Sequence, residues 1–114
     1  MMIYDKKHFN GLPKKKFVKA MRKEGIPIST GYSPLNKQDF IEFHLNSDAF
    51  KRIYSKERLN KYRRENHCPM NDMVCEDTAL WIYQSVLLGT KKDMEDIAEA
   101  AAKIQKNSEK LLNI

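Results

Sequence analysis

The sequence predicts an α+β fold in which helices cover one face of a small, mostly antiparallel sheet. Apolar residues recur at helical spacing in residues 12–24 and 90–111, which predicts two substantial helices. Short runs of strand-forming residues occur at 26–29 and 79–81, far apart in the sequence. A chain of 114 residues suits one domain, so we expect residues 1–114 to form a single domain with a modest core.

The first third of the chain is predicted to hold two short strands and a helix. Residues 2–9 predict a strand that ends at Asn10-Gly11. The helix should begin near Pro13, whose missing N–H is harmless in a first turn, and Gly25 should follow its end with a positive φ. Residues 26–29 should be extended and lie at a sheet edge, because Pro27 has no N–H to donate.

The middle of the chain is predicted to be a loop followed by helices. Residues 31–35 carry turn-forming residues and predict the loop. Residues 47–65 predict a helix capped by Ser47 or Asp48, with a break near Ser55.

Two further signals precede the strand predicted at 79–81. Cys68-Pro69 is predicted to stop the preceding helix. Asn71 or Asp72 is then expected to cap a short turn of helix that runs to Glu76.

The C-terminal third is predicted to be a strand, a loop and a long helix. The strand should run from Ala79 through Trp81, with Trp81 in the core. Thr90 should cap the last helix, and Asp93 resembles the reciprocal partner in a capping box. One apolar stripe of this helix indicates core packing rather than a coiled-coil seam; its members are Met94, Ile97, Ala101, Ile104 and Leu111.

Composition indicates a globular protein without disulfides or metal. Hydrophobic residues make up 41% and charged residues 32%. No apolar run approaches the roughly 20 residues that span a bilayer, and the N-terminus has no secretory signal, so we expect a cytoplasmic protein without a membrane partner. Cys68 and Cys75 are expected to be buried or half-buried free thiols, because with His67 they supply too few ligands, at the wrong spacing, for structural zinc.

The net charge of +6 and isoelectric point near 9.3 raise the question of nucleic-acid binding. Basic residues cluster at 14–16 and 51–64, where Tyr54 and Tyr62 interleave with the charges. Three interpretations apply to the segment 51–64, in decreasing order of preference: a solvated helical face, an interface with an absent domain or subunit, and a nucleic-acid surface. The sequence has no helix-turn-helix, zinc-finger or RNA-recognition signature that supports the third.

Motifs for self-sufficient catalysis are missing from the sequence. It has no Gly-x-Gly-x-x-Gly, no phosphate-binding P-loop and no Gly-x-Ser-x-Gly nucleophile elbow. No histidine stands at a recognisable spacing from a nucleophile, since His67 and Cys68 are adjacent and rarely face each other productively. We therefore assign no catalytic residue to this chain.

An ordered set of short segments resembles the C-terminal, small domain of the DegT/DnrJ/EryC1/StrS family of pyridoxal-phosphate-dependent sugar aminotransferases. The resemblance covers nearly the whole chain. Its segments are Phe17-Val18-Lys19-Ala20-Met21, Glu24-Gly25-Ile26-Pro27, Gly31-Tyr32-Ser33-Pro34-Leu35, Cys68-Pro69, Ala79-Leu80-Trp81-Ile82, Leu87-Leu88-Gly89, Asp93-Met94, Asp96-Ile97 and Lys103-Ile104. The Gly-Tyr-x-Pro-Leu form looks most like the branch that acts on amino sugars and aminocyclitols.

The resemblance implies the small-domain fold of fold type I aminotransferases and a role in closing the substrate site. In the family, a larger N-terminal domain holds pyridoxal phosphate and its Schiff-base lysine, and neither the cofactor-binding residues nor the lysine can be carried onto this chain. The chain is therefore expected to be inactive alone. Its implied partners are the missing N-terminal domain, a second subunit in a homodimer, and the parent enzyme's nucleotide-sugar, amino-sugar or cyclitol substrate.

The family resemblance also points to a substrate-facing loop after Pro27. Tyr32 matches a family tyrosine, whereas Gly31 and Asn36 stand where histidines are common, which weakens an acid–base role. The candidate substrate-binding residues are Ser29, Thr30, Tyr32 and Asn36. Tyr32 could equally anchor its loop on the Trp81 strand, and the two roles are compatible.

The alternative function is a free-standing basic α+β module that binds nucleic acid or an acidic protein partner.

Overall fold

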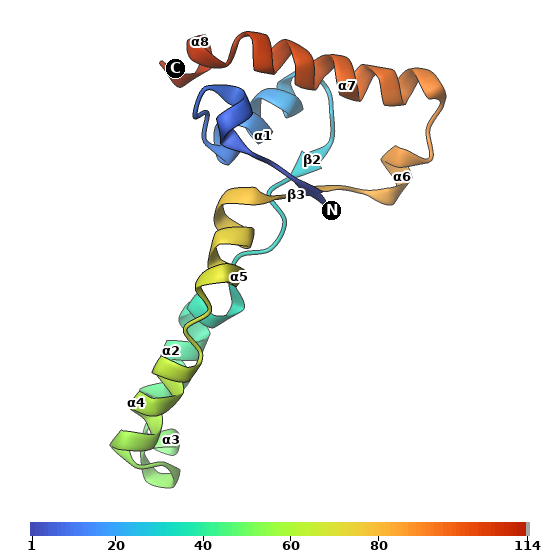
Figure 1. Cartoon of the computed structure of the whole chain (residues 1–114). Helices are drawn as coiled ribbons and strands as arrows, with labels where there is room; N and C mark the ends of the chain where they lie inside the picture. Colours follow the sequence, from blue (N-terminus) through green and yellow to red (C-terminus); the bar gives the residue numbers. More distant parts are fainter. Residues whose placement is uncertain (114) are drawn as a thin grey trace.

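The computed structural model describes residues 1–113, which form an L-shaped molecule (Figure 1). One limb, here called the head, comprises residues 1–32 and 79–113, and the other, the arm, comprises residues 33–78. The molecule measures 59 × 32 × 20 Å and its radius of gyration is 19.3 Å. A compact domain of about this length has a radius of gyration near 13 Å, so the arm projects well beyond a single core.

A three-stranded antiparallel sheet forms the inner corner of the head and confirms the α+β class. The central strand is β3 (Ala79–Ile82), flanked by β1 (Met2–Ile3) and β2 (Ile28–Ser29). Strand β2 lies at the sheet edge, as its proline predicted. Leu80 and Ile82 point into the core, because alternate residues of a strand face opposite sides.

Helices cover one face of this sheet, as predicted (Figure 1). The two long ones are α1 (Lys14–Lys23) and α7 (Lys91–Lys106). Short elements complete the head: η1 (Lys6–Phe9), α6 (Gln84–Leu87) and α8 (Ser108–Leu112). The predicted capping box of α7 is present, with the Thr90 N–H donating to Asp93 Oδ2 over 2.6 Å.

The core of the head lies between the sheet, α1 and α7. Its buried residues are Tyr4, Leu12, Phe17, Val18, Met21, Ile26, Ile28, Leu80, Ile82, Ala100 and Ile104. Tyr4 stacks on Phe17 with ring centroids 4.7 Å apart, and Phe9 packs edge-on against Phe17 at 4.9 Å. Ile97, Ala101 and Ile104 of the predicted stripe pack on this core from α7. The predicted helix ends at Lys106, so Leu111 packs on the core from α8 instead. Ala100, which the pattern omitted, is buried more deeply than Ala101.

The arm is built from short helices that run out from the head and back (Figure 1). Its elements are η2 (Leu35–Lys37), α2 (Asp39–Leu45), α3 (Asp48–Ile53), α4 (Lys56–Glu65), α5 (Pro69–Met73) and η3 (Val74–Thr78). The predicted break is confirmed, because the Ser47 and Ser55 hydroxyls accept N–H bonds at the starts of α3 and α4. Arg63 clamps α4 to α2 by donating to Glu42 Oε1 over 2.7 Å.

Two local predictions in the N-terminal and arm regions were wrong. The strand expected over 2–9 ends at Ile3, because Asp5 accepts a hydrogen bond from the Lys7 N–H and starts a 3-10 turn. The helix that precedes Cys68-Pro69 does end before it, at Glu65, but Pro69 is also the first residue of α5, where a missing N–H costs nothing. Asn71 and Asp72 consequently lie inside that helix instead of capping it.

The prediction for Trp81 was also wrong. The strand continues to Ile82 and is followed by the short helix α6, where a loop was predicted. Trp81 is 36% exposed, since its neighbours Leu80 and Ile82 take the core-facing positions.

Charge divides unevenly between the two limbs. The arm contains equal numbers of basic and acidic residues, so the net charge of +6 belongs to the head. Within the arm, Arg58 and Lys61 both lie 3.5 Å from Glu65. The segment 51–64 is therefore partly neutralised by its own limb, which favours a solvated or interface role over a nucleic-acid surface. None of the helices over residues 1–113 has the length and apolar character needed to traverse a lipid bilayer.

Tyr4 makes the stability of the head sensitive to alkaline pH. Its hydroxyl donates to the Leu12 carbonyl over 2.7 Å, and burial, aided by the charge of Asp5, raises its pKa to about 12. A tyrosine in the unfolded chain ionises near pH 10, so stability is intact below that pH and is lost as the pH rises toward 12. The loss amounts to roughly 2–3 kcal/mol for two pKa units.

We expect Tyr4→Phe to be less stable than the wild type by about 1 kcal/mol at pH 8 and more stable near pH 12. Urea denaturation at a series of pH values measures the crossover. Tyr83→Phe, which alters a tyrosine that is 65% exposed, is the control and should follow the wild type. A stability difference that stays constant with pH would contradict this role for Tyr4.

Candidate functional site

A buried lysine fixes the junction between head and arm, here called the elbow. Lys14 lies in the first turn of α1 and is only 4% exposed. Its Nζ donates to the carbonyl oxygens of Thr30 at 3.4 Å, Ala79 at 3.1 Å and Cys75. Burial lowers the pKa of Lys14, with weaker opposing effects from nearby acidic groups. One side chain thus joins α1 to both chain segments that pass between head and arm.

A cleft of about 570 Å³ opens at the elbow. Residues of both limbs line it: Lys6, Gly11, Pro13, Lys14, Lys15, Thr30, Gly31, Tyr32, Ser33, Pro34, Cys75, Glu76 and Asp77. The lining mixes lysines, carboxylates and hydroxyls with apolar surface of similar extent. Such a surface suits a polar ligand that offers both donors and acceptors.

The outward face of the sheet adjoins this cleft. Ser29 pairs with Trp81 across the strands, and both point away from the helices. The ring of Tyr32 meets the Trp81 indole edge-on, with centroids 5.7 Å apart. Tyr32 is nevertheless 78% exposed, so the loop anchor proposed for this residue leaves most of its ring and its hydroxyl open to a ligand.

The structure brings three of the four candidate residues together. Thr30 and Tyr32 line the cleft, and Ser29 Oγ accepts from the Gly31 N–H over 3.3 Å beside them. Asn36 is separate: it lies in η2 of the arm, where its Nδ2 donates to Asp72 Oδ1 over 3.3 Å. Contact of these residues with a substrate stays a prediction.

A polar network at the base of the arm was missed by sequence reasoning. Asp72 is buried and lies 3.1 Å from Lys37 Nζ, which also reaches Glu76 at 3.0 Å. Hydrogen bonds to Glu76 and Asp72 raise the pKa of Lys37. These residues come from segments more than thirty positions apart, so no local pattern could have linked them.

The described residues, 1–113, contain no cluster of three or more His, Cys, Asp or Glu side chains placed to hold a metal ion. Cys68 and Cys75 are both free thiols. Cys75 is half-buried as expected, whereas the expectation was wrong for Cys68, which is exposed. A cofactor aldehyde would need a lysine with an open, unprotonated amine. The most buried lysine, Lys14, does not fit this role, because its three ammonium hydrogens are directed at three carbonyls.

The chain is similar to three curated proteins, each named as an L-glutamine:3-amino-2,3-dideoxy-scyllo-inosose aminotransferase. The protein from Micromonospora echinospora is 28% identical over 108 residues, which is 91% of this chain and 25% of the relative. The proteins from Streptoalloteichus tenebrarius and Streptomyces kanamyceticus are 24% and 26% identical over 110 residues, 95% of this chain and 26% of each relative. The chain thus spans about a quarter of the length of the curated relatives it matches.

No family model matches the chain, and no solved structure matches it.

We expect Lys14→Met to lower the free energy of unfolding by roughly 2–3 kcal/mol, because it leaves buried carbonyls without a donor. Lys15→Met is the matched control: Lys15 is the neighbouring, exposed lysine on the same cleft, and its loss should change stability by less than about 0.5 kcal/mol. Urea denaturation followed by circular dichroism measures both. Equal midpoints for the two variants would show that Lys14 does not hold the elbow.

Gly31 is expected to position Trp81. Its φ is +74°, and a Cβ at this position would overlap the Trp81 indole. Gly11 has a similar φ of +80° but open space around it, so Gly11→Ala is a control for backbone strain alone, which costs roughly 1–2 kcal/mol.

Gly31→Ala should be more destabilising than Gly11→Ala and should also shift the fluorescence of Trp81, the only tryptophan in the chain. Unchanged Trp81 emission in a folded Gly31→Ala variant would rule out the close packing described here.

Proposed function

We propose that this chain is the C-terminal, small domain of a pyridoxal-phosphate-dependent aminotransferase of the DegT type. The similarity to the aminotransferase-named relatives carries the proposal, since it extends over 91–95% of this chain but only 25–26% of theirs. A match that fills one chain and a quarter of another is expected when one domain of a larger enzyme is compared with the whole. In this proposal the chain is inactive alone.

The exposed face of the sheet supports the proposal that another domain packs against it. Helices protect the inner face, whereas Ile3, Trp81 and Tyr83 on or beside the sheet are 66%, 36% and 65% exposed. Exposed apolar surface of this kind indicates an interaction site. We propose that the missing N-terminal domain covers this face and holds the cofactor, whose chemistry when bound is that of an electron sink.

The elbow cleft would then border the substrate site of the assembled enzyme. Tyr32 and Thr30 offer hydroxyl groups to the hydroxyls of a substrate, and Glu76 and Asp77 offer carboxylates to an ammonium group. An aminocyclitol carries both kinds of group, and the relatives' names specify an amino-substituted inosose. We therefore favour an aminocyclitol over a nucleotide sugar, on the strength of the relatives' names.

A chimera tests this proposal. This chain would replace the matched quarter of the Micromonospora echinospora relative, and glutamine-dependent amination of the ketocyclitol would be measured. We expect the chimera to be active where the truncated relative is not, with the isolated chain plus pyridoxal phosphate as the inactive control. A folded chimera without activity would count against the proposal.

Within an active chimera, Tyr32→Phe should lower kcat/KM about five- to tenfold, the effect of losing about one hydrogen bond of 1–1.5 kcal/mol. Tyr62→Phe removes a hydroxyl from α4 of the arm, outside the cleft and away from the exposed sheet face, and is the control. Equal activity of the two variants would remove Tyr32 from the substrate site.

A further inference from the structure

The net positive charge of the head comes entirely from its N-terminal segment. Residues 1–32 contain eight Lys or Arg and two Asp or Glu, whereas residues 79–113 contain five of each kind. Six of the eight cations belong to α1. Three of these already donate to backbone carbonyls, namely Lys14, Lys16 and Arg22.

The other three cations of α1 form an exposed row. They recur at every fourth position, at Lys15, Lys19 and Lys23, so their side chains follow one face of the helix. No ion pair within residues 1–113 involves any of the three. The part of the chain that the structure describes therefore leaves this row of positive charge without an acidic partner.

A groove runs beside this row, between α1 and the C-terminal helices. This groove, here called the basic groove, has a volume of about 370 Å³. Its apolar residues come from three helices: Ala20 of α1, Ile104 of α7 and Leu111 of α8. Lysines border these apolar residues from two helices, namely Lys16, Lys19 and Lys23 of α1 and Lys103 of α7.

The basic groove carries an excess of positive charge. Among residues 1–113, Glu24 is the only carboxylate that lines it, and Glu24 is already paired with Lys103 at 2.7 Å. A second hollow, of about 450 Å³, shares Lys19 and Lys23 with the groove and has no carboxylate in its lining. A ligand that reaches Lys19 and Lys23 therefore gains most if it is negatively charged.

The basic groove lies apart from the sheet face that the proposed N-terminal domain would cover. Helices α1 and α7 pack on the other face of the sheet, and no strand residue lines the groove. Figure 1 shows α7 and α8 along the side of the head that faces away from the arm. The groove is therefore open to a partner whether or not that domain is present.

The combination of recessed apolar residues and bordering lysines selects among acidic partners. Nucleic acid would find no aromatic side chain in the groove on which a base could stack. A membrane surface binds apolar side chains that project from a protein, whereas Ile104 is 3% exposed and Ala20 and Leu111 are half-buried. A protein segment that supplies its own projecting apolar side chains can fill the groove.

We propose that the basic groove binds an acidic amphipathic helix of a partner protein. Apolar side chains on one face of that helix would enter the groove and contact Ala20 and Leu111. Asp or Glu residues beside them would pair with Lys19 and Lys23, which sets the orientation of the helix and speeds its association. This inference does not depend on the proposed enzymatic role.

Binding of a designed peptide to the full chain tests the proposal. The probe is a fluorescein-labelled peptide of about 18 residues, with leucines on one helical face and glutamates elsewhere, long enough to be helical. A peptide of the same composition, with its leucines spread around the helix, is the control. Fluorescence anisotropy at physiological ionic strength measures both dissociation constants. We expect the amphipathic probe to bind about tenfold or more tightly than the scrambled peptide.

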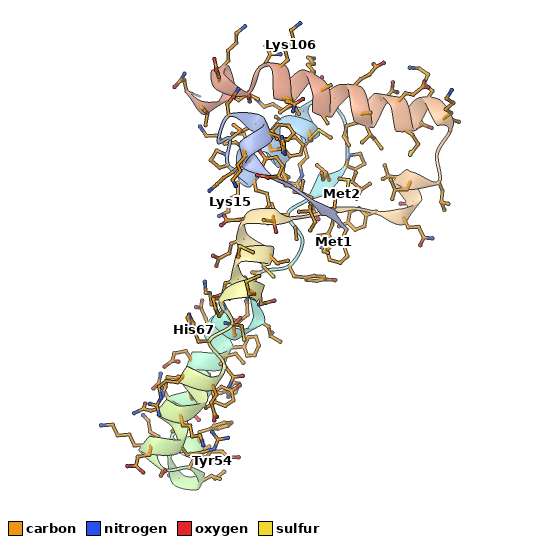
Figure 2. The ribbon with its side chains drawn as sticks, in the orientation of Figure 1. Met1, Met2, Lys15, Tyr54, His67 and Lys106 are labelled. Carbon is orange, nitrogen blue, oxygen red and sulfur yellow. The ribbon has the colours of Figure 1, made fainter. Side chains whose placement is uncertain are left out.

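Charge reversal locates the site. Lys19→Glu/Lys23→Glu should raise the Kd of the probe about tenfold or more, because like charges then face each other. Lys51→Glu/Arg52→Glu is the matched control, since it reverses as many charges beside Tyr54, at the far end of the arm (Figure 2). This control should change Kd by less than about twofold, because charges so distant are screened. Circular dichroism confirms that both variants fold.

A reciprocal peptide adds a gain-of-binding test. With lysines in place of its glutamates, the amphipathic probe should bind the Lys19→Glu/Lys23→Glu variant more tightly than it binds the wild type. A variant that merely disturbs the groove would bind neither peptide, so this result separates charge pairing from damage to the fold.

Four outcomes would overturn the proposal. Equal binding of the amphipathic and scrambled peptides would show attraction to charge alone. Equal effects of the α1 and arm reversals would place the peptide elsewhere. Tighter binding of single-stranded DNA or of phosphatidylserine vesicles than of the probe, lost in Lys19→Glu/Lys23→Glu, would assign the groove to another class of partner. No binding at submillimolar probe would count against the groove as a protein-binding site.

Discussion

The shape of this protein depends on the hydrogen bonds that the Lys14 ammonium group donates. It reaches the carbonyls of Thr30, Cys75 and Ala79, and so ties α1 to the two strands that border the arm. Other cations of the same helix act similarly: Lys16 donates to the Leu112 carbonyl over 2.8 Å and Arg22 to the Ile28 carbonyl over 2.7 Å. Three cations of α1 thus donate hydrogen bonds to backbone carbonyl oxygens of other segments. These bonds give the basic residues of this helix a structural role within the fold.

The two limbs are stabilised in different ways. The head has a continuous apolar core, whereas the arm buries few apolar side chains, among them Leu45 and Leu59, and relies on caps and ion pairs such as Arg63–Glu42. Ion pairs at a surface contribute little to stability. The arm therefore depends more than the head on contacts between residues of its own segment.

Sequence reasoning succeeded where the controlling interactions are local. Ser55 and Thr90 cap helices through bonds to residues three positions away, and Gly25 takes a φ of +86° after α1. The candidate loop came from the family resemblance, and Thr30 and Tyr32 do share a cleft. Asn36, which the resemblance also offered, lies in η2 of the arm, and its contact with a substrate stays a prediction.

The sequence by itself determined the α+β class, the two long helices, the edge position of β2 and the free cysteines, because periodicity, capping and proline geometry act over a few residues. Only the tertiary structure decided that Trp81 faces outward, that Lys14 is buried and that the net charge lies in the head. Each of these depends on which distant segments meet: Lys14 acquires its acceptors from residues sixteen to sixty-five positions away. No pattern along the chain reveals a contact of that kind, because the local sequence around a lysine does not show whether its side chain will be buried or exposed.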